Sequence, residues 1–250
     1  MTGPSTAPRM SVERLLEHLF RAAPTSPMAD ELAAWLAESR RFRAFAEANR
    51  DKIRKKLRGA TDVEAQHDLR AELRVARLLL ADRRIELAFE TYGSATGGPD
   101  FTVTYRATQA FNLEVTRRRP ASRSDADGGA LLAKLRQLPP SIANVVLVAA
   151  TDDRAEPLDV PAAIRSLQVR ADAGDDRFFT ERGLDGTRAF HQRYLRLGAV
   201  IVWFEGRDGD ERATHWVNRS ARSPVPDAAV VAVLACLRAE PLADRRPSVS

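Results

Sequence analysis

Three carboxylates, Glu72, Asp100 and Glu114, are the side chains whose types and spacing point most directly to chemistry. Glu114 lies within residues 111–116, where apolar and polar side chains alternate as they do in a strand with one face on a core. The alternation places Glu114 and Thr116 together on the face opposite the apolar side chains. Carboxylates that converge on such a face would bind a hard divalent cation such as Mg²⁺ through their oxygens. A cation held there can activate water and neutralise charge on a phosphodiester.

The elements that must position these carboxylates follow from the hydrophobic pattern. Glu72 lies at the edge of the apolar face of a predicted helix, with no basic residue three or four positions away. Asp100 directly precedes another alternating strand, so it lies at the open end of a hairpin if the two strands pair, and the register decides whether it meets Glu114. The predicted order is a helix at 62–81, strands at 85–89, 101–105 and 111–116, a helix at 130–138 and a buried strand at 145–149.

A short motif runs through these elements and consists of Glu72, Pro99-Asp100 and Glu114-Val115-Thr116. In type, order and surroundings it resembles the PD-(D/E)XK nuclease superfamily, which includes restriction enzymes, repair nucleases and Holliday-junction resolvases. The resemblance covers about residues 62–150 and implies a restriction-endonuclease-like αβββαβ core within an α/β protein. It also implies a hydrolase that uses Mg²⁺ or Mn²⁺, held by the three carboxylates and the main-chain carbonyl oxygen of Val115.

One position departs from the pattern of that superfamily. Two residues after the last carboxylate the pattern has lysine, and this sequence has Thr116. The lysine ammonium positions the attacking water and offsets developing negative charge, whereas a threonine hydroxyl forms hydrogen bonds but carries no charge. Lys134, on the following predicted helix, could supply the ammonium from another element. The candidate catalytic residues are therefore Glu72, Asp100, Glu114, Thr116 and Lys134.

Basic side chains are concentrated in two places. Residues 40–58, predicted as one helix that ends near Gly59, contain nine Lys and Arg against two acidic residues, a net charge of +7 in a chain of net +5. This helix is interpreted either as a surface that contacts phosphates or as a solvated face whose positive charge is balanced by acidic residues elsewhere in the chain. A run of three arginines follows Thr116 and suits phosphate contacts, with a solvated loop as the alternative. The candidate nucleic-acid-binding residues are Arg50, Lys52, Arg54, Lys55, Lys56, Arg117, Arg118 and Arg119.

The sequence supports two functional hypotheses, and a third interpretation assigns the chain to an unrelated fold. In the first, the chain is a metal-dependent endonuclease that hydrolyses nucleic acid phosphodiesters, with or without attenuation by Thr116. In the second, it is a catalytically inactive nuclease-like module that binds nucleic acid or a protein partner. The third is an unrelated α/β fold, in which Glu72 is simply an exposed glutamate and Asp100 a turn residue after proline.

Composition and length indicate the class of protein and its domain organisation. With 250 residues, 44% of them hydrophobic and 29% charged, the chain is expected to fold into a globular protein. No apolar run is long enough for a membrane span, residues 1–10 lack the apolar core of a secretory signal, and Cys236 is the single cysteine, so a cytoplasmic location is expected. The predicted organisation is a flexible terminus at 1–10, a helical extension with the basic helix at 11–60, a nuclease-like core at 61–150, a C-terminal α/β addition packed on that core at 151–238 and a flexible tail at 239–250. The addition is predicted to contain helices at 161–170, 186–197 and 228–238 and a hairpin of strands at 200–204 and 213–217.

Overall fold

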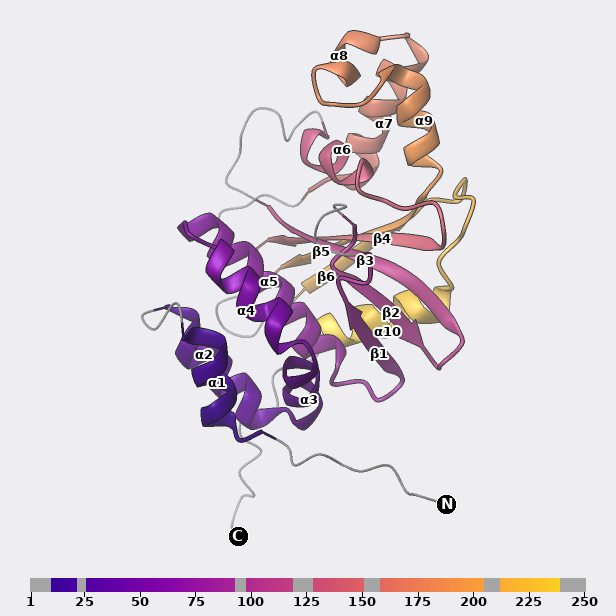
Figure 1. The fold of residues 1–250 in the computed structure, drawn as a ribbon. Coiled ribbons are helices and arrows are strands. Elements are labelled where there is room, and N and C mark those ends of the chain that lie inside the picture. The colour runs from indigo at the N-terminus through magenta and orange to yellow at the C-terminus, as the bar shows by residue number, and fades with distance from the viewer. Residues whose placement is uncertain are drawn as a thin grey trace. The chain divides into compact units, whose positions relative to one another are not determined.

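The protein is described here from a computed structural model, which confirms the expected α/β class (Figure 1). The chain divides into two compact units, residues 1–81 and residues 82–250. The expected boundary at residue 60 differs from this division, because the helix at 63–79 belongs to the first unit. The structure describes residues 10–21, 26–92, 98–118, 128–150, 158–204 and 212–238, and the expected flexible ends at 1–10 and 239–250 lie almost wholly outside these ranges.

The first unit is helical. Side-chain oxygens cap several of its helices: Ser11 Oγ accepts a hydrogen bond from the main-chain N–H of Arg14 at 3.3 Å, and Asp62 Oδ1 accepts one from Ala65 at 2.7 Å. Trp35 and Phe42, both buried, meet edge to face with ring centroids 6.1 Å apart. The helices are α1 (Val12–Phe20), α2 (Met28–Glu38), α3 (Arg40–Ala48), α4 (Arg50–Gly59) and α5 (Val63–Leu79).

The basic segment forms two helices, α3 and α4, so the prediction of one continuous helix is wrong. Asn49 lies between them with φ −110° and ψ 16°, outside the helical region. Its side-chain Nδ2 donates to the carbonyl oxygen of Phe45 at 2.8 Å, and its main-chain N–H donates to the same oxygen at 3.1 Å. Asparagine competes for main-chain hydrogen bonds in this way, which is why it ends helices more readily than it continues them. The helix does end at Gly59, as expected.

The second unit contains a six-stranded mixed sheet in the spatial order β1-β2-β3-β4-β5-β6. The first three strands pair antiparallel, β3, β4 and β5 run parallel, and β6 is antiparallel to β5. The C-terminal addition therefore extends the same sheet as the predicted core. The strands are β1 (Ile85–Phe89), β2 (Phe101–Tyr105), β3 (Gln109–Arg117), β4 (Ala143–Ala150), β5 (Leu197–Phe204) and β6 (Arg212–Val217).

Helices cover both faces of this sheet. On one face α6–α9 bury a cluster that includes Val146 and Val200 of the parallel strands together with Phe179 and Phe190. On the other face the indole Nε1 of Trp203 donates to the carbonyl oxygen of Leu237 in α10 at 3.1 Å. Because both faces are covered, β4 and β5 are apolar along almost their whole length. The helices are α6 (Gly129–Leu135), α7 (Val160–Asp172), α8 (Asp176–Thr180), α9 (Gly186–Tyr194) and α10 (Asp227–Arg238).

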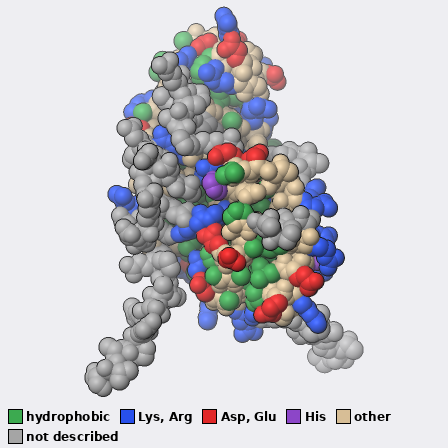
Figure 2. Space-filling model, turned by 90° about the vertical axis from the view of Figure 1, so that its left-hand side faces the viewer, with side chains coloured by type: hydrophobic (Ala, Val, Ile, Leu, Met, Phe, Trp, Pro, Cys, Tyr) green, Lys and Arg blue, Asp and Glu red, His purple; other side chains and the backbone are tan. Residues whose placement is uncertain are grey.

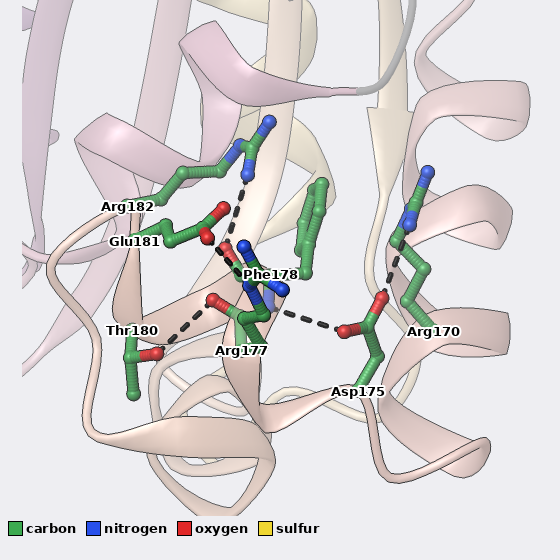
Figure 3. Close-up of polar contacts among 7 residues, drawn as sticks. All are labelled: Arg170, Asp175, Arg177, Phe178, Thr180, Glu181 and Arg182. Carbon is green, nitrogen blue, oxygen red and sulfur yellow. Dashed lines mark hydrogen bonds and ion pairs between the residues drawn. The ribbon is translucent and has the colours of Figure 1, made fainter.

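The short helix α8, which the sequence pattern did not predict, is held by arginines from both sides (Figure 3). The ring of Phe178 lies between two guanidinium groups, 4.3 Å from that of Arg170 and 3.8 Å from that of Arg182. Asp175 caps the helix, because its Oδ1 accepts from the N–H of Phe178 at 3.1 Å, and its Oδ2 lies 3.1 Å from Arg170 Nη1.

Across the described ranges, none of the helices combines the length and the apolar character needed to cross a membrane.

Candidate active site

Glu114 lies in the middle of the sheet. The predicted alternation along β3 is present, with Leu113 and Val115 on one face and Asn112 and Glu114 on the other. Helices cover both faces, however, so the polar side chains are buried as well, and Glu114 is only 4% exposed. Its second carboxylate oxygen, Oε2, is buried too. A carboxylate removed from water to this extent is costly unless nearby groups compensate its charge.

Lys134 supplies that compensation from α6. Its ammonium Nζ lies 2.7 Å from Glu114 Oε1, and its side chain is 23% exposed. The lysine therefore connects the buried carboxylate with the protein surface. An ammonium group thus lies beside Glu114, although the position two residues further along the strand is occupied by Thr116.

Asp100 lies beside the same stretch of β3. The antiparallel register of β2 and β3 pairs Phe101 with Leu113, and its continuation by one residue places Asp100 opposite Glu114. The Oδ2 atom of Asp100 accepts a hydrogen bond from the main-chain N–H of Val115 at 2.9 Å. Asp100 thus contacts the main chain at the residue that follows Glu114. Glu114 belongs to the face that α6 covers, because Lys134 of that helix contacts it. Asp100 reaches the adjoining main chain of β3 from just before β2.

The direction of the Val115 peptide groups follows from the ladder between β3 and β4. Arg118 donates its main-chain N–H to the carbonyl oxygen of Ala149 in β4 at 2.7 Å. Because hydrogen bonding alternates between the two edges of a strand, the even-numbered residues of this part of β3 bond to β4, and Val115 faces the β2 edge. β2 ends at Phe101, so the carbonyl oxygen of Val115 is directed to the region just beyond that strand, where Asp100 lies.

The oxygen atoms collected here suit a hard cation. Two carboxylates and a main-chain carbonyl are the donors that Mg²⁺ and Mn²⁺ prefer, and Mg²⁺ is commonly held by one or two carboxylates, with water and substrate phosphates as its other ligands. Within the described ranges no group of three or more Asp, Glu, His or Cys side chains is arranged to hold a metal ion. A cation at this place would therefore rely on Asp100, Glu114 and the Val115 carbonyl.

Glu72 belongs to the first unit and has a partner there. Its Oε2 lies 2.5 Å from the ammonium Nζ of Lys56 in α4, and both side chains are largely buried. The absence of basic residues at helical spacing in the sequence did not reveal this pair, because the lysine comes from a neighbouring helix. The structure thus brings Asp100, Glu114 and Lys134 together, and it places Glu72 with a residue of the basic segment.

The residues after Glu114 alternate between the faces of the sheet. Thr116 is half-buried on the Glu114 face, opposite Val148 of β4. Arg117, the last residue of β3, belongs to the other face, and Arg118 lies just beyond the strand. The Nη1 atom of Arg118 is buried and has no hydrogen-bond partner among the residues that the structure describes. Arg119 lies outside the described residues.

Two buried asparagines next to Glu114 were missed by sequence reasoning. Asn112 and Asn144 are register partners on β3 and β4, both are 0% exposed, and Nδ2 of Asn112 donates to Oδ1 of Asn144 at 3.0 Å. The hydroxyl of Thr102 on β2 donates to Oδ1 of Asn112 at 3.3 Å. Three strands are therefore joined by side chains immediately beside the carboxylates, which fixes their register. The signal in the sequence was an asparagine inside the apolar run of β4.

Two of the basic side chains of α4 form ion pairs with acidic residues of the first unit. Arg54 lies 3.3 Å from Asp51, and Lys56 pairs with Glu72 as described above. Lys52 and Lys55 are exposed, and Arg50 is half-buried. Figure 2, which views the protein from the left-hand side of Figure 1, shows Lys and Arg interspersed with acidic and hydrophobic side chains. Part of the basic charge of this helix is thus balanced inside its own unit.

The contacts that bear on function are the ion pair of Lys134 with Glu114 and the hydrogen bond of Asp100 to the main chain of Val115. Comparisons of this chain with protein-family models, with curated proteins and with solved structures find no match.

Proposed function

We propose that the second unit carries a divalent-metal-dependent phosphodiesterase site of the PD-(D/E)XK type, acting on nucleic acid. The observation that carries this proposal is the ammonium of Lys134 at 2.7 Å from the buried carboxylate of Glu114. That pair lies beside Asp100, which the strand register places opposite Glu114. The motif has its lysine two residues after the last carboxylate, where this chain has Thr116. Lys134 would supply the missing ammonium from α6.

The order of elements supports the same proposal. The chain runs α5, β1, β2, β3, α6 and β4, which is the αβββαβ order that the resemblance implies. The first three strands form an antiparallel meander, and β4 returns parallel to β3 after α6. The resemblance places one carboxylate just before the second strand and another within the third. Asp100 directly precedes β2, and Glu114 lies in the later half of β3.

Each residue has a role in the proposed reaction. Asp100, Glu114 and the carbonyl oxygen of Val115 would hold the cation, which when bound supplies an activated water and charge neutralisation. Lys134 offers an ammonium donor that stabilises negative charge as it develops on the phosphoryl oxygens. Arg118, whose buried Nη1 has no hydrogen-bond partner among the described residues, would contact a phosphate through its guanidinium. The exposed lysines of α4 remain candidates for contacts with the nucleic acid backbone.

A second function is favoured by one specific observation, the uncharged Thr116. If the ion pair between Lys134 and Glu114 is purely structural, the unit would be a nuclease-like module that binds nucleic acid without cleaving it. Such binding would weaken steeply with salt, because several Lys and Arg side chains would replace counterions on the phosphates.

The two functions separate in one set of reactions. Labelled single- and double-stranded DNA and RNA are incubated with the protein and Mg²⁺ or Mn²⁺, beside the variant Glu114→Gln and the control Arg188→Gln, an exposed arginine on α9. The proposal expects metal-dependent cleavage by the wild type and the control and loss of cleavage by Glu114→Gln. Cleavage that survives Glu114→Gln would refute the site. Salt-sensitive binding without cleavage under any condition would establish the second function.

A further inference from the structure

A pocket of about 40 Å³ opens at the amino-terminal ends of the parallel strands β4 and β5. Glu114 lies in the later half of β3, which runs parallel to β4, so this pocket is a separate place within the second unit. Three connections form its walls: the one that precedes β4, the one from α9 to β5 and the one from β6 to α10. The lining residues are Pro140, Ile142, Leu195, Arg196, Arg222 and Ser223.

Positive charge collects around this pocket. Arg193 and Arg196 each donate from Nη1 to the carbonyl oxygen of Leu138, at 3.4 and 3.2 Å, so both guanidinium groups lie beside one oxygen. Burial, and then the charges of Arg193 and Arg222, lower the pKa of Arg196. Across the described ranges no carboxylate forms an ion pair with any of these three arginines. Three cations gathered without a protein anion favour the binding of an anion from solution.

The walls of the pocket are fixed before any ligand arrives. The buried side chain of Asn144 donates to the carbonyl oxygen of Arg196 at 2.9 Å, and the main-chain N–H of Arg222 donates to that of Leu195 at 2.9 Å. Asn218, which is 1% exposed, donates to the carbonyl oxygen of Leu197 at 2.9 Å. Buried amide groups satisfied in this way hold in place the main-chain segments that carry Arg196 and Arg222.

A glycine allows these connections to approach each other closely. A Cβ atom on Gly198, the second residue of β5, would lie 2.6 Å from the side chain of Val225 and 3.1 Å from the carbonyl oxygen of Asn144. The first distance is shorter than Cβ atoms tolerate, and the second would require the neighbouring main chain to move slightly, so a side chain here would push the two segments apart. The close contact brings the connection that carries Arg222 and Ser223 against the start of β5, where Arg196 lies.

We propose that this pocket binds a phosphoryl group, a tetrahedral oxyanion with up to two negative charges. Arg196 and Arg222 supply planar guanidinium donors that match phosphoryl oxygens, and the hydroxyl of Ser223 adds a neutral donor. A volume of about 40 Å³ is far below the ~300–1,000 Å³ of pockets that enclose whole small molecules. The pocket therefore takes the phosphoryl group itself, either as free phosphate or as the terminal phosphate of a nucleic acid strand. This site does not depend on the proposed phosphodiesterase activity.

The test measures binding by calorimetry to the full chain, with ionic strength held constant by chloride. Inorganic phosphate is the first probe, and a single-stranded oligonucleotide with a 5′-phosphate or a 5′-hydroxyl is the second. The variants are Arg222→Gln and Arg196→Gln, with Arg188→Gln as the matched control. Arg222 is exposed, and its guanidinium forms no hydrogen bond with the described residues, so its replacement is not expected to disturb folding.

The wild type and Arg188→Gln are expected to bind phosphate equally, and Arg222→Gln about tenfold or more weakly, as for the loss of one charge-assisted hydrogen bond. If the 5′-phosphate strengthens oligonucleotide binding and Arg222→Gln abolishes that gain, the source is a nucleic acid end. If only inorganic phosphate responds to the substitution, the source is free phosphate. Absence of phosphate binding by the wild type, or equal binding by a folded Arg222→Gln variant, would overturn the proposal.

Discussion

The ion pair between Glu114 and Lys134 gives a prediction that depends on burial as much as on charge. The variant Lys134→Met removes the ammonium from a carboxylate that is 4% exposed while keeping a side chain of similar length. Removing one partner of a buried pair costs about 3–5 kcal/mol, because the other charge stays away from water. Lys134 itself is 23% exposed, so the lower end of that range, about 3 kcal/mol of unfolding free energy, is expected.

A double-mutant cycle separates the pair from the individual side chains. Lys134→Met, Glu114→Gln and the double variant are unfolded with urea, and the three free-energy changes are compared with the wild type. The double variant is expected to be more stable than Lys134→Met, with a coupling of about 2 kcal/mol or more, since no charge is then buried. Coupling below about 0.5 kcal/mol would mean that solvent already screens this carboxylate and that the pair is not a buried one.

The same variants also report on the cation. If Glu114 belongs to a metal site, added Mg²⁺ should stabilise Lys134→Met, because the cation takes over the compensation of its charge. The double variant, which lacks the carboxylate, should gain less. Equal responses of the two variants to Mg²⁺ would place any bound cation elsewhere in the protein.

Three further predictions follow from the second unit. Asn144→Ala should lower the unfolding free energy by about 2 kcal/mol or more, measured in urea, because several carbonyl oxygens lose their buried donor. Phe178→Ala should cost about 3 kcal/mol and Phe178→Leu clearly less, since the larger truncation removes the ring between two guanidinium groups. The main-chain N–H of Thr187 donates to Asp176 and lowers the pKa of that carboxyl, so an NMR titration should find it below its ordinary value. The contribution of this contact to stability is present at neutral pH and is lost as the pH falls through that lowered pKa.

Much of the strand arrangement could be predicted from local pattern. The bounds of β1 and β2 agree with the alternating runs, because turn residues and a proline delimit them. Ser11 could be recognised as a capping residue, and the helix predicted from Asp62 begins one residue later, because Asp62 caps it. The buried strands β4 and β5 were recognised by their apolar runs. Their predicted bounds are shorter than those in the structure, because both strands extend beyond their most apolar residues.

Other features depended on contacts that the sequence does not display. The break at Asn49 was missed because its neighbours continue the helical pattern on both sides. The short helix α8 spans too few residues for any periodicity to appear.

Part of the candidate site could be predicted from the sequence, and part required the structure. Strand alternation was enough to single out Glu114, and the register that brings Asp100 beside it could only be stated as a condition. The partner of Glu72, Lys56, comes from another helix, and no rule based on spacing within one helix could find it. The pairing of Asn112 with Asn144 required the register of two parallel strands that lie far apart in the sequence.

In the proposed site, Lys134 takes the place of the motif lysine beside the carboxylates. The most direct test is the single-turnover rate of metal-dependent cleavage by the wild type, Lys134→Arg and Lys134→Met, each shown to be folded under the assay conditions. Lys134→Met is expected to lose about 10²–10³ of the rate, and Lys134→Arg, which keeps the charge, is expected to retain more of it. Cleavage by Lys134→Met at the wild-type rate would show that Lys134 takes no part in the reaction.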